Sequence, residues 1–555
     1  MSEDRAISVL KSVDGLEMTM KQWVPVWDKL ARRIMPRRVV EMSSKNEASI
    51  PNQSDWSSFS PRACNALQKL AAGHLAFITP INQIWYKYAS DIAEKERVDE
   101  WYSRCSEKSI KRLARSNFYT EIHECFMDRC LFGTGCLYFG GDDANGINFK
   151  YIPCGKFAIA ENASGRVDAL ARRFMYSAKQ AADEFQEENL GEKVKEALAD
   201  PMKMYEPCWE FVHLVRPRAK WMPGSDNPME WRFESVYVSV DDKKIVDDGG
   251  YQEFPYIVTR FLKWGTGAYG LPPGLFAFPN ICDELFLREL LNRLGEIAVN
   301  PRVLLAADQV GEVNFRAGGQ TIVSKDAVME GLPREWMTGG RYDIGKDRLA
   351  SEEEAIGRAF FEDAFTNISN VDREMTAAEV FARESEKILP FSPSFSLVVS
   401  DLEPFHERYF NILFRSGEFE EFGSVPKEAV VPIMGGTSNK IAAPKVSYCG
   451  KMALAIESLQ SDAIPNCLQL LSMVAQFDQS AVDLIKSREV LRTFFRAKGF
   501  PEDGMRGVDE LKKIDERNEQ AAADQQELMM AQAAASAAKD GTQAAATAQQ
   551  AGITL

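Results

Sequence analysis

Cysteine and histidine are the side chains in this sequence best suited to nucleophilic chemistry. The chain has ten cysteines but only four histidines, which are His74, His123, His213 and His406. A Cys–His catalytic pair also needs a third group that orients the imidazole. Because no local signature of a thiol enzyme surrounds any of these residues, we expect no catalytic residue. A thiol-dependent hydrolase built on an unrecognised pair stays open as an alternative.

Metal binding is the second chemistry that these residue types could support. His123, Cys125, Cys130 and Cys136 lie close together in the sequence. A zinc site usually contains paired C-x-x-C or H-x-x-x-H elements, and both are absent here. We therefore expect no metal, and we interpret Cys125 as small filling of a helical core.

A glycine-rich segment, Gly265-Thr-Gly267-Ala-Tyr-Gly270, matches the dinucleotide-binding pattern G-x-G-x-x-G. That pattern needs a helix directly afterwards, whose N-terminus faces the pyrophosphate. Leu271-Pro272-Pro273 follows instead, so we predict a turn. P-loop, G-x-S-x-G and H-E-x-x-H patterns are also missing, and together these absences predict a protein without a cofactor.

Composition narrows the class of protein further. Hydrophobic residues make up 45% of the chain and charged residues 26%, as in ordinary globular proteins. The formal net charge of −15 gives no overall electrostatic reason to hold nucleic acid. The longest uncharged run, Leu70 to Tyr86, is too short and too polar to span a bilayer, so we expect no membrane contact. The first residues lack an apolar leader, which predicts reduced cytosolic thiols.

Hydrophobic periodicity predicts an α+β fold of about two to four domains or one elongated subunit. The expected N-terminal helices are 16–35, one that begins at Ser60-Pro61 and ends before Thr79, 98–116, and 120–131 closed by Gly133. Short β-branched and aromatic runs over 135–265 predict antiparallel strands, interrupted by one helix near 177–199.

The second half of the chain is predicted to be mainly helical. Asn280 is expected to cap a helix that runs to 299 and has one apolar face. Short extended pieces follow over 301–345. Capping boxes at Ser351/Glu354 and Thr376/Glu379 predict two more helices around a seven-residue loop, 369–375. Further predictions are a helix over 396–415 and an Ala- and Gln-rich helical end after about 508.

Several stretches, in this order, resemble the head-to-tail connector (portal) proteins of short-tailed bacteriophages. They are 62–88, 125–141, 152–174, 254–274, 289–308 and 375–417. The match runs in order over roughly residues 15–450, most of the chain. What carries the resemblance is the order, since no single stretch is a strict signature.

The resemblance implies a twelve-subunit ring at one capsid vertex, with a channel through which double-stranded DNA is packaged and ejected. It also implies the following division of the chain: wing 1–275, with a β-rich part at 135–265; stem helix 276–300; clip 301–345; second stem helix 346–368; tunnel loop 369–375; returning wing helices 376–450; and crown 451–555. Closed rings need two different contact faces on each subunit, which fits amphipathic stem helices.

Partners and site residues follow from the same resemblance. The implied partners are the terminase large subunit, a tail adaptor protein, the major capsid and scaffolding proteins, and DNA bound without sequence specificity. In the tunnel loop, Asn370, Asp372 and Arg373 are expected to face the DNA. An ion pair of Arg373 with Asp372 or Glu374 of a neighbouring subunit stays open as an alternative for that residue. In the clip, Arg334, Arg341 and Lys346 are expected to meet terminase and adaptor. The expected location is the virion, after assembly in the host cytoplasm, and a non-portal capsid or scaffold protein remains a third possibility.

Overall fold

The computed structural model describes most of the first 449 residues of the chain. The described stretches are 2–38, 58–81, 83–89, 96–142, 146–299, 341–365 and 389–423, with short pieces within 303–335 and 425–449 and scattered residues after 490. The chain divides into two compact units, Met1–Ile456 and Glu457–Leu555. All elements discussed below belong to the first unit. Among the described residues, no helix is both long enough and apolar enough to cross a membrane.

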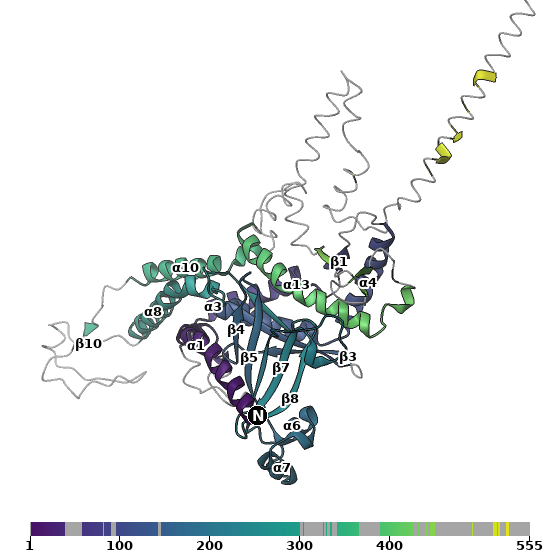
Figure 1. The fold of residues 1–555 in the computed structure, drawn as a ribbon. Coiled ribbons are helices and arrows are strands. Elements are labelled where there is room, and N and C mark those ends of the chain that lie inside the picture. Colours follow the sequence, from purple (N-terminus) through teal and green to yellow (C-terminus); the bar gives the residue numbers. More distant parts are fainter. Residues whose placement is uncertain are drawn as a thin grey trace, which may run out of the picture. The chain divides into compact units, whose positions relative to one another are not determined.

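A five-stranded antiparallel sheet in the order β4-β5-β6-β7-β8 forms one layer of the fold (Figure 1). Its strands are β4 (Phe157–Glu161), β5 (Val167–Tyr176), β6 (Trp209–Pro217), β7 (Phe233–Ser239) and β8 (Lys244–Tyr251). Helix α1 (Ser2–Ile34) buries Ala6, Val9 and Val13 against one face of this sheet. Helices α6 (Ala178–Phe185) and α7 (Glu192–Ala199) cover aromatic side chains on the other face. The sheet therefore lies between two helical layers.

A larger core surrounds a second sheet, in the order β3-β2-β9. The strands are β2 (Thr134–Asp142), β3 (Gly146–Ile152) and β9 (Tyr256–Arg260), and the helices around them are α3 (Pro61–Phe77), α4 (Glu96–Ala114), α5 (Phe118–Phe132) and α13 (Ser392–Arg415). Phe118, Phe139, Phe149 and Phe405 form an aromatic cluster with neighbouring ring centroids 5.1–6.2 Å apart. Since Phe405 lies on α13, this cluster fixes a late helix onto early elements.

Two long helices, α8 (Pro273–Val299) and α10 (Tyr342–Ala359), pack side by side (Figure 1). Phe361, with a left-handed φ of 55°, separates α10 from the short α11 (Glu362–Phe365). The remaining elements are β1 (Tyr86–Ala89) paired with β14 (Lys445–Tyr448), β10 (Val303–Leu304) paired with β11 (Arg334–Glu335), β12 (Val430–Pro432) paired with β13 (Asn439–Ile441), and the 3₁₀ turns Glu187–Asn189, Pro228–Glu230, Leu389–Phe391 and Glu420–Phe422.

The α+β prediction and several element boundaries are confirmed. Ser60 caps α3, accepting a hydrogen bond from the backbone nitrogen of Ala63 at 3.0 Å. Gly133 ends α5 in the left-handed conformation. Strands β2 to β9 all lie in the predicted β region, to within one residue of its start, whereas α1 begins at Ser2 rather than near residue 16.

Two predicted helix starts are wrong. Asn280 does not cap α8, because the helix already begins at Pro273 and contains Pro279. Its first two residues are buried, and Gly274 lies so close to Ile34 and Phe360 that a Cβ would approach them to 2.9 and 3.5 Å. Ser351 likewise lies inside α10, since that helix begins at Tyr342. The Thr376 start lies outside the described residues.

Candidate functional site

The pair formed by α8 and α10 carries the candidate functional surface. Leu287 and Leu291 of α8 are buried, and Gly345 of α10 leaves room for Leu291, whose Cδ2 would lie only 2.8 Å from a Cβ at that position. Polar contacts also join the helices: Arg288 pairs with Glu353 at 2.8 Å, and Asn280 donates to Glu352 at 2.8 Å. The two helices therefore form one stable hairpin-like pair.

Helix α8 also carries a row of apolar side chains that nothing in the described structure covers. Phe276 is 56% exposed, Phe286 65% and Leu290 43%. At 3.6 residues per turn, Phe286 and Leu290 share one side of the helix, next to the buried side that holds Leu287 and Leu291, whereas Phe276 lies nearly three turns away and in line with Leu287. We call Phe286 and Leu290 the α8 apolar stripe. Exposed apolar rows of this kind usually mark a contact surface.

A cluster of charged side chains attaches the helix pair to α3 at the end where α8 begins and α10 ends, which we call the base of the pair. Arg62 of α3 forms an ion pair with Glu362 and donates to the backbone oxygen of Glu353 at 3.2 Å. Gly357 is required for this approach, because a Cβ there would lie 2.4 Å from the Arg62 guanidinium. Burial raises the pKa of the Glu284 carboxyl, and Arg288 offsets part of that cost at 2.6 Å. The base of the pair is thus held by paired side chains.

The predicted clip residues fall on different elements. Arg334 lies on β11, opposite Leu304 of β10. Arg341 directly precedes α10 and pairs with Asp343 at 3.6 Å, with both side chains largely exposed. Lys346 is exposed on the first turns of α10. Arg341 and Lys346 therefore lie at the same end of α10, and their contact with terminase and adaptor stays a prediction.

The predicted tunnel-loop residues Asn370, Asp372 and Arg373 lie outside the described residues. The nearest described elements are α11, which ends at Phe365, and the 3₁₀ turn that begins at Leu389. Their expected contact with DNA therefore stays a prediction.

One Cys–His pair does come together in space, between Cys130 Sγ and His74 Nδ1 at 3.9 Å. Both side chains are fully buried. Burial raises the pKa of the Cys130 thiol to about 12 and lowers the pKa of His74 well below its ordinary value. His74 Nδ1 also bonds to the backbone oxygen of Leu70 at 2.7 Å. A protonated, inaccessible thiol is a packing group rather than a nucleophile.

Metal ligation finds no support either. Within the stretches that the structure describes, no group of three or more Cys, His, Asp or Glu side chains could hold a metal ion. Cys125 is buried beside Thr259, as expected for core filling. The side chain of His123 is instead 36% exposed on the surface of α5.

The glycine-rich segment forms the predicted turn, but a helix does follow it, since α8 begins at Pro273. Gly270 is required by packing, because a Cβ there would lie 2.3 Å from the oxygen of Gly133. The first residues of α8, Pro273 and Gly274, are buried, so this helix N-terminus is not open to a phosphate group.

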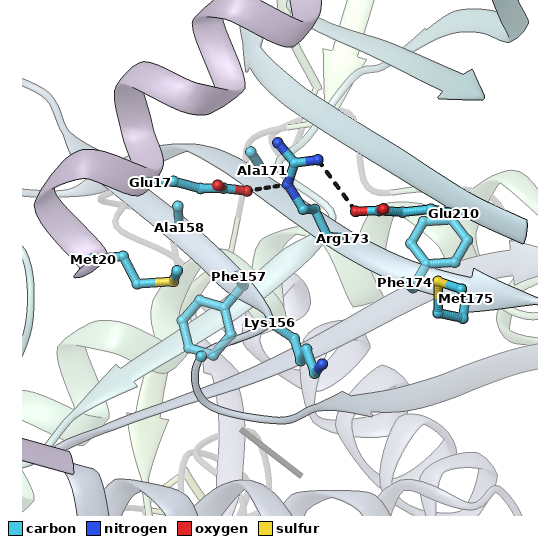
Figure 2. A pocket seen from close by; sticks show the side chains of 11 residues that line it. Glu17, Met20, Lys156, Phe157, Ala158, Ala171, Arg173, Phe174, Met175 and Glu210 are labelled. Atoms are coloured by element: carbon cyan, nitrogen blue, oxygen red, sulfur yellow. Dashed lines mark hydrogen bonds and ion pairs between the residues drawn. The ribbon is translucent and has the colours of Figure 1, made fainter. Parts of the chain in front are cut away.

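A small pocket of about 200 Å³ lies where α1 meets the sheet (Figure 2). Figure 2 shows Arg173 of β5 between Glu17 of α1 and Glu210 of β6. Arg173 also pairs with Asp14 at 2.8 Å. Three carboxylates therefore surround this guanidinium. Its ion pairs attach α1 to the sheet, and its positive charge is already neutralised and not offered to a ligand.

Comparison with known proteins defines the class. The family model described as "Bacteriophage head to tail connecting protein" matches residues 7–506, so the chain belongs to this family. It is 23% identical over 541 residues to the "Portal protein" of Salmonella phage epsilon15, covering 95% of this chain and 93% of that protein. It is 24% identical over 410 residues to the "Probable portal protein" of Bordetella phage BPP-1, covering 71% and 72%.

These matches confirm the predicted identity as a portal, or head-to-tail connector, protein. They support this interpretation over both alternatives, the thiol-dependent hydrolase and the non-portal capsid or scaffold protein. The family is structural, and its members are components of the phage particle. No sequence signal marked the α8 apolar stripe beforehand, although the apolar face to which it belongs was recognised.

Proposed function

We propose that twelve copies of this chain form a ring at one capsid vertex, and that double-stranded DNA passes through the ring during packaging and ejection. The ring would dock the terminase large subunit first and a tail adaptor protein later. Capsid and scaffolding proteins would contact it during assembly in the host cytoplasm. The chain would have no catalytic activity of its own.

The α8 apolar stripe is the observation that carries this proposal. A phenylalanine side chain has about 200 Å² of surface, so the 65% exposure of Phe286 leaves about 130 Å² that a neighbouring subunit could bury. Burying that area would stabilise each subunit interface by about 3 kcal/mol. The side of α8 that bears Glu289, Asn292 and Glu296 is polar instead. Two chemically different sides suit the head-to-tail contacts of a closed ring.

The proposed roles of the segments follow the family resemblance. Helices α8 and α10 would be the stem, residues 301–345 the clip and residues 369–375 the tunnel loop. Arg334, Arg341 and Lys346 would contact terminase and adaptor, while Asn370, Asp372 and Arg373 would face DNA. Replacing Arg373 by alanine and measuring packaged genome length tests this last role; unchanged packaging would remove it.

Assembly of α8 variants tests the ring itself. The double substitution Phe286→Ser and Leu290→Ser should lower the assembled mass measured by light scattering, because each interface loses apolar burial. Both side chains are exposed in the single subunit, so circular dichroism should show an unchanged fold. Glu296→Ser on the polar side is the matched control and should assemble normally. Full assembly of the double variant would contradict the proposal.

A further inference from the structure

A groove of about 880 Å³ lies far from the α8 apolar stripe in the sequence and has no role in the function proposed above. One wall is the 218–232 loop, which connects β6 to β7, and the other wall is the C-terminal half of α13. Phe233 and Phe254 form part of its apolar lining. The volume is large enough to take several side chains of a bound segment.

The loop wall is built by its own hydrogen bonds. Met222 donates its backbone N–H to the backbone oxygen of Glu230 at 2.9 Å, which closes the loop across its width. The indole nitrogen of Trp231 donates to the backbone oxygen of Ser225 at 2.7 Å. Trp221 and Met222 are nevertheless 48% and 59% exposed. An ordered loop therefore holds two large apolar side chains toward solvent, which lowers the entropy cost of binding a partner.

The helical wall is fixed by a single carboxylate, Glu253. It accepts hydrogen bonds from Asn411 at 2.8 Å and from Arg415 at 3.0 Å. Phe414, next to Arg415 on α13, is 36% exposed and lines the groove. This wall therefore also presents an apolar side chain from a rigid position.

Negative side chains remain in excess along the groove when those that form ion pairs within the chain are left out of the count. Arg415 is taken by Glu253, and Arg166 pairs with Glu403 at 2.8 Å. Arg232 remains, and its charge acts on the nearby Asp168. In the part of the chain that the structure describes, no ion pair or hydrogen bond joins the carboxylates of Glu407 and Asp226 to any other side chain.

We infer that this groove docks a segment of another protein of the phage particle that carries apolar side chains together with lysine or arginine. The exposed Trp221, Met222 and Phe414 would cover the apolar side chains. The carboxylates of Glu407 and Asp226 would pair with the basic ones, and the net charge of −15 would further favour a basic partner. The inference does not depend on the number of subunits in the ring or on its DNA channel.

Fluorescence anisotropy with the full-length protein tests the inference. The probes are three short labelled peptides: alternating leucine and arginine, the same peptide with glutamate for arginine, and the same peptide with serine for leucine. The leucine–arginine peptide should bind tightest, because it alone supplies both chemistries. Trp221→Ala should weaken its binding on the order of tenfold and Glu407→Gln several-fold, the latter mainly at low salt.

Matched control variants distinguish binding in the groove from nonspecific binding elsewhere on the surface. Trp264 is 69% exposed elsewhere on the surface, and Glu192 is an exposed carboxylate on α7, so Trp264→Ala and Glu192→Gln should leave binding unchanged. Equal binding by all variants, or no preference among the peptides, would overturn the inference. So would a subunit that loses ring assembly through Trp221→Ala while keeping its melting temperature, because the occupant would then be a second copy of this chain.

Discussion

Gly133 is a position where a small change should have a large effect on the fold. This residue ends α5 with a φ of 86°, in the left-handed region. A Cβ at Gly133 would lie 2.2 Å from the oxygen of Gly270 and 2.8 Å from the nitrogen of Pro272. Both neighbours are backbone atoms in the turn that leads into α8, so neither can rotate away.

Gly133→Ala should therefore lower the free energy of unfolding in two ways. The left-handed conformation costs a residue with a Cβ about 1–2 kcal/mol. Displacing the packed backbone of the turn costs about 1–3 kcal/mol more. Together these losses are about 2–5 kcal/mol, which corresponds to a fall of roughly 4–10 °C in the melting temperature of a large domain.

Thermal unfolding followed by intrinsic fluorescence measures this change. Gly15→Ala is the matched control, because Gly15 lies inside α1 and a Cβ added there would meet no atom within 4 Å. Alanine there should stabilise the protein by about 0.5–1 kcal/mol, since glycine is unfavourable inside a helix. If Gly133→Ala melted within a degree of the wild type, the argument from close backbone packing would be refuted.

Two further predictions concern buried titratable groups. Burial lowers the pKa of His406 to about 3, so the unfolded state takes up its proton first as the pH falls below about 6.5. Each pH unit in that window should lower the free energy of unfolding by up to about 1.4 kcal/mol. The melting temperature should therefore fall from pH 7 to pH 5, and it should fall less steeply in His406→Gln. Equal dependence of the melting temperature on pH in the two proteins would contradict this reasoning. Mass spectrometry after native-state alkylation should find exposed Cys208 modified and Cys105, Cys125 and Cys130 unmodified, because burial raises the pKa of each of these three thiols to about 12. Rapid labelling of Cys130 would instead support thiol chemistry.

Local sequence signals predicted those boundaries that depend on local chemistry. A serine oxygen followed by proline predicted the start of α3, and glycine predicted the end of α5. Both signals act through backbone groups within a few residues. The short β-branched and aromatic runs over 135–265 likewise predicted an antiparallel β region.

Boundaries that depend on distant contacts were not predictable in this way. The Ser351/Glu354 pattern is compatible with a helix interior, and only the packing of Gly345 against Leu291 shows that α10 begins earlier. The start of α8 at Pro273 depends in the same way on Ile34 and Phe360, which are remote in the sequence.

The candidate site shows the same limit. Periodicity identified Phe286, Leu287, Leu290 and Leu291 as one apolar face of a helix. The structure divides that face into a buried half, Leu287 and Leu291, and an uncovered half, Phe286 and Leu290. This division depends on where α10 lies, because α10 covers only part of the apolar face.

Light scattering coupled to size exclusion, followed by negative-stain imaging of the main peak, tests the central claim most directly. The account predicts a mass near twelve times 62.3 kDa and a ring with a continuous central hole. Rings of eleven or thirteen subunits would keep the function but would mean that the capsid sets the number of subunits. A chain that stayed monomeric at high concentration, with the α8 apolar stripe exposed to solvent, would contradict the account.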